Sequence, residues 1–488
     1  MTLLTLIPVA VPVLAALAYA AFGWGRATAW ISATGAATML AAAITLAVHS
    51  GQAGASAVAG GVLRVDALSA FMLIVIGAVA LLATAATPAY FRGEIGARRA
   101  TARTAARHSV LVQLFLAAMS LAVLAADLGV LWVAIEATTL ITAFLVGQRR
   151  TKAAVEAAWK YVVVCSTGIA LALLGTLLLN YAAHGTGLNL AALTENAHGL
   201  DPGVARIAVA LLILGFGTKA GLAPLHAWLP DAHSQAPAPV SALMSGVLLS
   251  VALYAIMRVK VIADPVLGHG FVRALLAVMA LASLALAASL MLAQRDYKRM
   301  LAYSSIEHLG LAALGVAIGS PLAIMAALLH VLGHGLTKAV LFLGAGRILQ
   351  STGTSRISDV RGLATRGPLL AGCVGLGVLA LIGLPPFSLF ASELGLVRAG
   401  FGAGLGWVTA AALLLVLVIA AALIGHSSRM LLGRSPEGPG AATAPVRVTT
   451  VLALTLISGL VACAALGIAA GPLNTLLQDA ANLLTGAP

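Results

Sequence analysis

The stretch GFGTKAGLAPLHAWLPDAHSQAPAPVSA, residues 215–242, places a lysine and a proline inside what otherwise has the composition of a membrane-spanning helix. Lys219 follows a long apolar run, and an amine at the centre of a bilayer costs about 3 kcal/mol or more unless a partner or a function compensates. Pro224 removes a backbone donor and breaks the helix. Membranes tolerate such breaks only beside protein or a water-filled cavity. The stretch therefore predicts a polytopic membrane protein with an ionisable interior.

The composition of the whole chain supports this interpretation. Of its 488 residues, 61% are hydrophobic and 9% are charged, whereas soluble domains carry about 25% charged residues. Because a span needs about 20 apolar residues, we predict an all-α fold of about fourteen transmembrane helices. The predicted spans lie near residues 2–22, 27–48, 66–88, 109–125, 128–147, 159–181, 204–222, 238–257, 271–293, 301–319, 322–346, 369–390, 404–426 and 448–471.

The net charge of +13 is distributed as in a membrane protein and does not indicate a nucleic-acid partner. Most Lys and Arg residues fall in the loops between spans 1–2, 3–4, 5–6, 9–10, 11–12 and 13–14. The positive-inside rule then places these loops in the cytoplasm and both termini on the outer face of the cytoplasmic membrane. Arg258, Lys260 and Arg273 are exceptions, because they flank a loop on the predicted outer side.

The three cysteines, Cys165, Cys373 and Cys463, lie in separate spans without a CxxC pair. This arrangement supports neither a zinc site, nor an iron–sulfur cluster, nor a disulfide framework. We therefore expect the chain to bind no metal and no cofactor of its own.

Two proline breaks suggest an internal repeat. The first contains Pro224 and Pro230, and the second, in GLPP, contains Pro385 and Pro386. They fall in spans 7 and 12, and broken helices at matching places in two halves are typical of inverted-repeat transporters. We predict two inverted five-helix repeats, spans 4–8 and 9–13. The corresponding segments are residues 1–108, 109–258, 259–432 and 433–488.

Glu136, in LWVAIEATTL, is the predicted partner of Lys219. Either it is a helix-end carboxylate that reaches a loop arginine, or it binds protons under the influence of the nearby lysine. A buried lysine can gain and lose a proton near neutral pH, so the two residues would form a switchable pair. His226 follows in the same segment, and we interpret it as a structural histidine near the break in preference to a proton relay.

His330, His334 and Lys338 recur every four residues in HVLGHGLTKAV and therefore share one helix face. A polar stripe through an apolar span favours a hydrated proton relay over the alternative of three unrelated polar residues. Paired histidines at this spacing also suggest a metal site, but the segment offers no acidic third ligand. We therefore predict a relay without metal.

Glu307 and His308 begin span 10, and Glu393 closes span 12. Glu307 is either part of the same polar axis or solvated at the cytoplasmic boundary. Glu393 is either its last ionisable member or a helix-end carboxylate on the outer face. Asp66 and Asp127 are expected at helix N-termini, where the helix dipole favours carboxylates.

These motifs resemble the antiporter-like membrane subunits shared by respiratory complex I, Mrp antiporters and membrane-bound [NiFe]-hydrogenases. The resemblance is carried by residues 219–242, by QRDYKRMLAYSSIEHLG (294–310) and by HGLTKAVLFLGAG (334–346). WVAIEATTL (132–140) and AYSSIEHLG (302–310) most resemble hydrogenase-4 component F of the formate-hydrogenlyase type. The resemblance covers nearly the whole chain.

The resemblance implies roles for individual residues. Glu136 matches the glutamate of helix five, Lys219 the lysine of helix seven, and Glu393 the ionisable residue of helix twelve. His334 and Lys338 match the central relay. Family members often carry a second lysine in helix eight, where LLSVALYAIMR has Ser250. We therefore expect water to connect Lys219 to the histidine stripe.

The expected function is proton translocation, with Na⁺ as a possible alternative ion, by a membrane subunit without a redox centre of its own. The resemblance implies a group 4 [NiFe]-hydrogenase or formate-hydrogenlyase-like host, in which membrane and peripheral redox partner subunits hold the NiFe and Fe–S centres. A complex I subunit, an Mrp-type Na⁺/H⁺ antiporter subunit and a membrane coupling subunit of inorganic-carbon uptake remain alternatives. Subunit composition distinguishes them.

Overall fold

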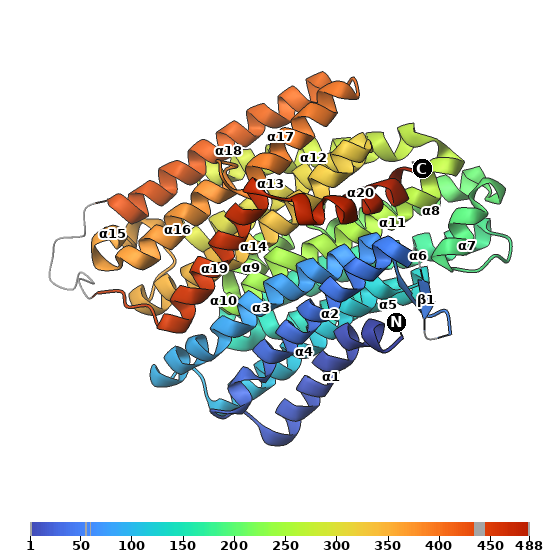
Figure 1. Ribbon diagram of the computed structural model, residues 1–488. Helices are drawn as coiled ribbons and strands as arrows, with labels where there is room; N and C mark the ends of the chain where they lie inside the picture. The colour runs from blue at the N-terminus through green and yellow to red at the C-terminus, as the bar shows by residue number, and fades with distance from the viewer. Residues whose placement is uncertain (1, 54–55, 59, 434–444, 487–488) are drawn as a thin grey trace.

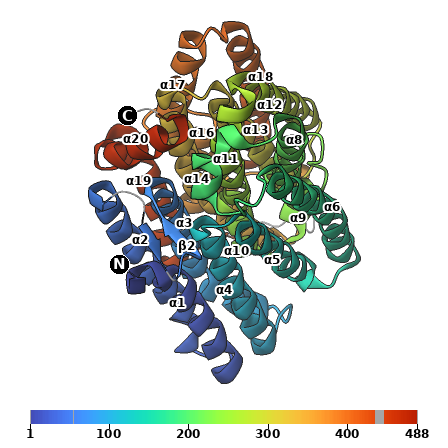
Figure 2. The same ribbon diagram turned by 90° about the vertical axis from the view of Figure 1, so that its right-hand side faces the viewer.

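A computed structural model describes residues 2–53, 56–58, 60–433 and 445–486. Helices run side by side through most of the molecule, with α1, α2 and α4 at one end, α17 and α18 at the other, and α14 between them (Figures 1 and 2). The described chain contains 13 helices that are long and apolar enough to cross a membrane, plus the shorter α16. Helix α16 is the first half of broken span 12, which accounts for the fourteenth predicted span.

The elements up to residue 267 are α1 (Thr2–Phe22), α2 (Ile31–Ala53), β1 (Ser56–Val58), β2 (Leu63–Val65), α3 (Ala67–Gly96), α4 (Ala102–Leu124), α5 (Leu128–Val146), α6 (Lys152–Ala182), α7 (Leu190–Glu195), α8 (Pro202–Lys219), α9 (Trp228–Gln235), α10 (Ala238–Leu243), a π-helical turn (Met244–Leu248) and α11 (Leu249–Leu267). Strands β1 and β2 form a small antiparallel pair in which Ser56 lies opposite Val65.

The later elements are α12 (His269–Leu292), α13 (Tyr297–Ile318), α14 (Pro321–Thr352), α15 (Leu363–Arg366), α16 (Pro368–Leu381), α17 (Ser388–Gly402), α18 (Gly406–Leu432), α19 (Thr450–Ile468) and α20 (Gly471–Thr485). Short 3₁₀ helices cover Thr28–Trp30, Gly147–Arg149, Ala197–Gly199 and Ile357–Asp359. Residues 434–444 of the predicted fourth segment lie outside the described residues. The division into four segments stays a prediction.

The two predicted breaks have the same local structure. Gly221 follows α8 with φ of 77°, and Gly383 follows α16 with φ of 68°, a region that favours glycine. In both, the next residue, Leu222 or Leu384, donates its amide five residues back, to Gly217 at 2.9 Å and to Leu379 at 3.1 Å. This is the Schellman arrangement that ends helices. Matching Gly-Leu-X-Pro endings are what an internal repeat predicts.

The prolines take two positions around these breaks. Pro224 lies between α8 and α9, and Pro385 and Pro386 lie between α16 and α17. Pro230, predicted to be part of the break, instead lies in the first turn of α9. Backbone amides in the first turn of a helix have no acceptor within that helix, so a proline costs little there.

Two charges that violated the positive-inside rule are not solvated loop residues. Arg258 on α11 pairs with Asp66 at 2.7 Å, and Lys260 pairs with Asp264. Asp66 also caps α3 by accepting from the Ser69 amide at 2.9 Å, so its predicted N-terminal position is confirmed. Because the charges of Arg258 and Lys260 are buried and neutralised, they do not report on the orientation of a loop.

Candidate functional site

Three lysines are among the largest fully buried side chains of the molecule: Lys219, Lys298 and Lys338. A buried amine is tolerated only when hydrogen bonds replace its hydration. Here hydroxyls and backbone carbonyls accept hydrogen bonds from all three. Lys298 was assigned to a charged loop from its neighbours in sequence. It is instead 1% exposed, because its chain reaches inward from the first turn of α13.

Lys219 ends α8 inside a cradle built by α5 and α6. Its Nζ donates to Thr139 Oγ1 at 2.8 Å and to the Tyr161 hydroxyl at 2.5 Å, and it lies 4.8 Å from the centroid of the tyrosine ring. Thr139 lies one turn after Glu136 on α5 and interacts with its carboxylate. The predicted Glu136–Lys219 pair is therefore connected through a threonine hydroxyl.

Glu136 lies in the middle of α5, so the helix-end interpretation of this residue is wrong. Its side chain interacts electrostatically with Lys219. One carboxylate oxygen, Oε2, is buried and has no hydrogen-bond partner among the described residues. A buried polar atom without a partner is uncommon in native proteins, and a catalytic role or a bound water or ion can account for one.

Lys338 is the buried lysine of α14, in the second half of the chain. Its Nζ donates to the Leu301 carbonyl of α13 at 2.6 Å and to the Ser304 hydroxyl one turn further on. Glu307 follows on the same helix, is 3% exposed and interacts electrostatically with Lys338. Its predicted alternative, a solvated position at the cytoplasmic boundary, is therefore wrong.

The predicted histidine stripe faces α13 and α17. His308 Nδ1 lies 3.0 Å from His330 Nε2, and His330 Nδ1 lies 3.0 Å from the Ser392 hydroxyl. The ring of His334 is tilted by 36° against that of His308, with centroids 5.1 Å apart, and neither of its ring nitrogens has a hydrogen-bond partner in the described part of the chain. Directly hydrogen-bonded imidazoles can pass a proton from ring to ring, since each ring can accept on one nitrogen and donate from the other.

Glu393 lies in the second turn of α17, beside the second break. A Cβ placed on Gly383 would meet Glu393 Oε2 at 2.2 Å, so the carboxylate lies directly over that glycine. Ligand atoms of Glu393, His308 and His330 lie within 4.8 Å of one another. The alternative of a helix-end carboxylate on the outer face is therefore wrong.

The same three residues are of types that hold zinc-like ions, two imidazoles and one carboxylate. The sequence argument against a metal relied on the absence of an acidic ligand near the paired histidines. An acidic group is in fact present, because Glu393 reaches the histidines from α17, far along the chain. The absence of an acidic ligand is therefore no longer an argument against a metal. The imidazole–imidazole hydrogen bond is the contact that the structure itself shows at this place.

His226 behaves as the sequence predicts for a structural residue. It lies between α8 and α9, and its Nδ1 makes a 3.2 Å contact with the Pro224 carbonyl two residues earlier. Sequence reasoning did not include His233, seven residues on, in the site. It is fully buried in α9.

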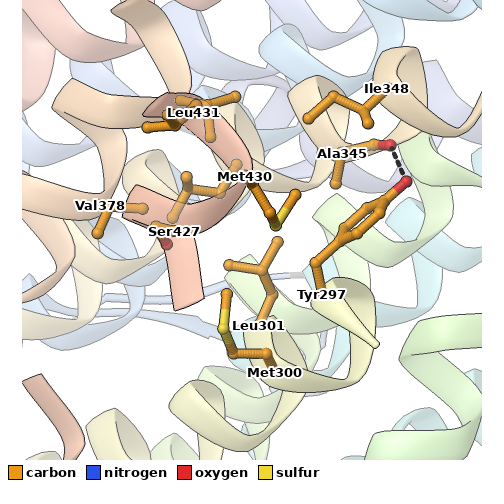
Figure 3. Close-up of a pocket in the computed structure, with 11 residues that line it drawn as sticks. Tyr297, Met300, Leu301, Ala345, Ile348, Val378, Ser427, Met430 and Leu431 are labelled. Carbon is orange, nitrogen blue, oxygen red and sulfur yellow. Dashed lines mark hydrogen bonds between the residues drawn. The ribbon is translucent and has the colours of Figure 1, made fainter. Parts of the chain in front are cut away.

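An apolar pocket borders the Lys338 end of the site (Figure 3). It lies between α13, α14, α16 and α18, and Leu301, whose carbonyl binds Lys338, forms part of its wall. Tyr297 also lines it and donates its hydroxyl toward the Ala345 carbonyl at 3.4 Å. Its leucine and methionine lining makes it a gap between helices and not a hydrophilic channel.

Sequence reasoning missed the groups that hold the charged residues. They are Thr139 and Tyr161 around Lys219, Ser304 around Lys338, and Ser392 around His330. A local signal was present for three of them, because each lies within one turn of a predicted acidic residue on the same helix. Tyr161 has no such signal, since it reaches Lys219 from α6.

Comparisons with known proteins agree with this arrangement. A model described as the NADH:quinone oxidoreductase/Mrp antiporter transmembrane family matches residues 125–420. A hydrogenase-4 component F homolog from Methylacidiphilum infernorum is 44% identical over 59% of this chain and 62% of its own length. The aligned part thus spans about three fifths of that relative.

Two solved structures share the fold along almost the whole chain. One, from an archaeal membrane-bound sulfane sulfur reductase, has a TM-score of 0.88 and 25% identity, covering 99% of this chain and 98% of the other. The other, from respiratory complex I of Thermus thermophilus, has a TM-score of 0.81 and 26% identity, covering 99% and 100%. Since the family model matches more than half of its length, this chain belongs to the NADH:quinone oxidoreductase/Mrp antiporter family of multi-pass membrane proteins.

Proposed function

We propose that this chain is a proton-translocating membrane subunit of a redox-coupled complex. The observation that carries the proposal is a series of ionisable groups along the bundle, in which the lysines and histidines are buried and the terminal carboxylates, Glu136 and Glu393, are half-buried. It begins at Glu136 and Lys219 and continues at Lys338 through the histidines to Glu393. Such groups are costly inside a membrane and mark ion pathways.

The mechanism follows from the two half-sites. Loss of the proton from Lys219 weakens its attraction to the Glu136 carboxylate, so protonation of one residue is coupled to protonation of the other. In the second half, Lys338 and Glu307 are coupled in the same way, and the His308–His330 contact leads toward Glu393. Redox chemistry would be done by partner subunits, which would hold the NiFe and Fe–S centres, while this chain binds no cofactor.

A group 4 [NiFe]-hydrogenase or formate-hydrogenlyase-like complex is the proposed host. The 44% identity to the hydrogenase-4 component F homolog named above supports this host. A complex I-type host is the second candidate, supported by the fold match that covers the full length of the Thermus subunit. We further propose a cytoplasmic membrane location with both termini on the outer face, which the lysine- and arginine-rich loops support.

Purification of the tagged chain from its native membrane tests the proposal. We expect hydrogenase-type large and small subunits to co-purify, and the assembled complex in vesicles to acidify or alkalinise the lumen when its redox substrate is added. Co-purification with complex I subunits would favour the second candidate. Redox turnover of the wild-type complex without proton movement would overturn the proposed function.

A further inference from the structure

We propose that His308, His330 and Glu393 form a binding site for Zn²⁺, which occupies it reversibly as an inhibitor and not as a cofactor. Ligand atoms of the three residues lie within 4.8 Å of one another, on α13, α14 and α17. Two imidazoles and one carboxylate hold zinc with a fourth position open. Mg²⁺ and Ca²⁺ prefer shells of oxygen ligands, so the site selects against them. Binding does not depend on the proposed function, whereas the block of transport rests on it.

The two histidines already lie at a separation that suits zinc. His308 Nδ1 and His330 Nε2 are 3.0 Å apart, and two nitrogens bound to one tetrahedral ion at about 2.0–2.1 Å are about 3.3 Å apart. Zn²⁺ therefore replaces the proton shared by the two rings with little movement of α13 and α14. Glu393 lies within 4.8 Å of a nitrogen of each ring, a gap that its side chain closes by rotation.

The His330 ring is held as the rings of metal ligands usually are. A ligating imidazole donates its other nitrogen to an oxygen acceptor, which fixes the ring and its tautomer. The Ser392 hydroxyl donates to the Leu389 carbonyl at 2.8 Å, so its oxygen accepts from His330 Nδ1 at 3.0 Å. His330 Nε2 is then the nitrogen with the free lone pair, and it is the one that faces His308.

Buried nitrogens beside the site have no partner. His308 Nε2 has none among the described residues, although the Leu381 carbonyl interacts with the ring. When Zn²⁺ binds Nδ1, the proton of this imidazole moves to Nε2, and that carbonyl can accept it. His334 is 1% exposed, and both of its nitrogens lack partners in the described part of the chain. Since its ring centroid lies 5.1 Å from that of His308, His334 is placed to fill the fourth position.

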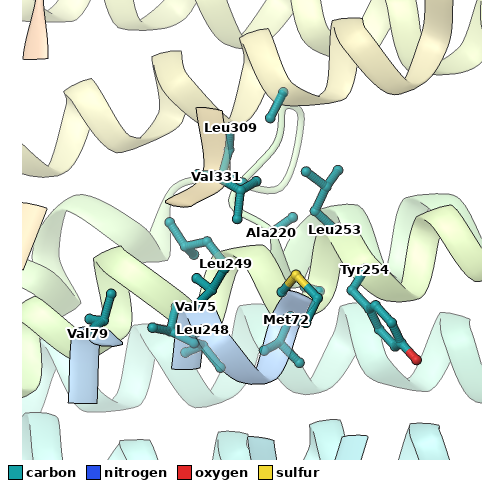
Figure 4. Close-up of a cluster of buried hydrophobic side chains, with 14 of the residues drawn as sticks. Met72, Val75, Val79, Ala220, Leu248, Leu249, Leu253, Tyr254, Leu309 and Val331 are labelled. Carbon is teal, nitrogen blue, oxygen red and sulfur yellow. The ribbon is translucent and has the colours of Figure 1, made fainter. Parts of the chain in front are cut away.

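Apolar packing directly beside the site holds α13 and α14 in place. Leu309 follows His308 in the chain, and Val331 follows His330. Both belong to a buried cluster that also contains leucines of α11 (Figure 4). Such packing fixes the ligands before the ion arrives, and an apolar shell limits the access of competing water.

The charge of the site and the exposure of Glu393 favour the entry of a cation. Glu307 interacts electrostatically with Glu393 and with Lys338. When all three groups are ionised, the carboxylates exceed the lysine in charge, and a bound cation offsets the excess. Glu393 is only half-buried, and residues 384–386 at the break beside it are exposed. An entering ion therefore meets Glu393 first and the histidines behind it.

Bound Zn²⁺ blocks the proposed proton path. It occupies the lone pairs through which His308 and His330 would pass a proton, and a ring nitrogen bound to a metal can neither accept nor donate one. Zinc has no redox chemistry, so the ion changes no electron count in the complex. Removal of the ion by a chelator restores the imidazole–imidazole hydrogen bond.

Equilibrium dialysis of the purified full chain against buffered Zn²⁺, with a histidine-free affinity tag, tests the site. We expect one tightly bound ion per chain that excess Mg²⁺ does not displace. His330→Gln and Glu393→Gln each remove a ligand and should weaken binding by more than about 100-fold, and Ser392→Ala by about 10-fold, because loss of an outer partner costs roughly 10–100-fold. His269→Gln is the matched control and should bind as wild type, since this exposed histidine lies 2.9 Å from the Asp264 carboxylate and could hold an ion only adventitiously.

Unchanged binding in both His330→Gln and Glu393→Gln would overturn the site, as would binding that is lost only in His269→Gln. If His330→Gln does not fold, Glu393→Gln, a change at a half-buried position, decides in the same way. A wild-type chain that binds no Zn²⁺ would overturn the inference without any variant.

The block is measured in redox-driven vesicles that contain the wild-type complex. Zn²⁺ at the concentration that fills the site in dialysis should stop most proton transport, and a chelator should restore it. Zn²⁺ that binds without slowing transport would overturn the block. A wild-type complex that moves no protons in the absence of Zn²⁺ would refute the proposed function, and dialysis would still decide whether the site exists.

Discussion

The buried Asp66–Arg258 pair joins the N-terminus of α3 to α11, and Asp66→Asn should destabilise the protein well beyond the loss of a helix cap. Asp66 accepts from Arg258 Nη2 at 2.7 Å, and Arg64 Nε lies 3.3 Å from its second oxygen. The Asp66 and Arg258 side chains are 2% and 6% exposed. An asparagine can still cap α3, but it leaves the charge of Arg258 buried without a counter-charge.

The size of the effect follows from the pKa of Asp66. Burial by itself would raise this pKa, but the charge and hydrogen bond of Arg258, helped by Arg64, lower it from 3.8 to about 2. At 1.36 kcal/mol per pKa unit, the ionised carboxylate contributes about 2 kcal/mol to the free energy of unfolding. Because the folded-state pKa is lowered, this contribution is complete above about pH 4 and is lost as pH falls toward about 2. Removing one partner of a buried pair costs about 3–5 kcal/mol, so we expect a loss of about 3 kcal/mol at neutral pH.

Unfolding of the purified protein in mixed micelles, titrated with SDS, measures this loss. Asp127→Asn is the matched control, because Asp127 caps α5 through the amides of Gly129 and Val130. It should cost only a few tenths of a kcal/mol, since asparagine is an equally good cap. The double variant Asp66→Leu/Arg258→Met should recover much of the loss. Equal, small effects of Asp66→Asn and Asp127→Asn would show that the pair contributes nothing, and the reasoning would be refuted.

Two further predictions concern Gly221, at the first break, and Lys298, which binds carbonyls at the end of α9. Gly221→Ala should lower the yield of folded protein far more than Gly185→Ala. Both glycines have positive φ, but a Cβ at Gly221 would lie 2.3 Å from a leucine methyl, whereas the space around Gly185 is open. Equal yields of the two variants would show that the side chain of the leucine moves away and relieves the close approach. Lys298→Met should cost about 1–3 kcal/mol, because it leaves the Ser234 carbonyl without its donor, whereas the Ala236 carbonyl keeps the 3.3 Å hydrogen bond from the Ser241 hydroxyl. SDS titration against Lys152→Met at an exposed position measures this cost. An unchanged free energy of unfolding would show that another group satisfies the Ser234 carbonyl.

Features with a local chemical cause were predictable from the sequence. The breaks follow from Gly-Leu-X-Pro, whose glycine and proline end a helix regardless of what surrounds them. The shared face of His330, His334 and Lys338 follows from helical spacing alone. The apolar runs predicted the spans, although α3 continues to Gly96 past its predicted end at residue 88.

Features that depend on distant partners were not predictable in this way. Asp66 and Arg258 are 192 residues apart, so the sequence showed only an apparent violation of the charge rule. Lys298 lies in a basic run that is typical of a solvated loop, and only the fold brings carbonyls to it. Glu393 meets the histidines from another helix, which is why neither its environment nor the three-residue cluster could be inferred from neighbours in sequence.

The central claim is that protons move along the axis formed by the two half-sites. Lys338→Met removes the charge but keeps much of the length of the side chain, and His334→Gln removes titration but keeps a polar side chain. The most direct measurement is redox-driven pH change in vesicles, divided by the amount of assembled complex, for wild type and these two variants. The account predicts wild-type assembly with transport lowered about 100-fold in each. Unchanged transport per assembled complex in both variants would contradict it and show that the stripe serves structure alone.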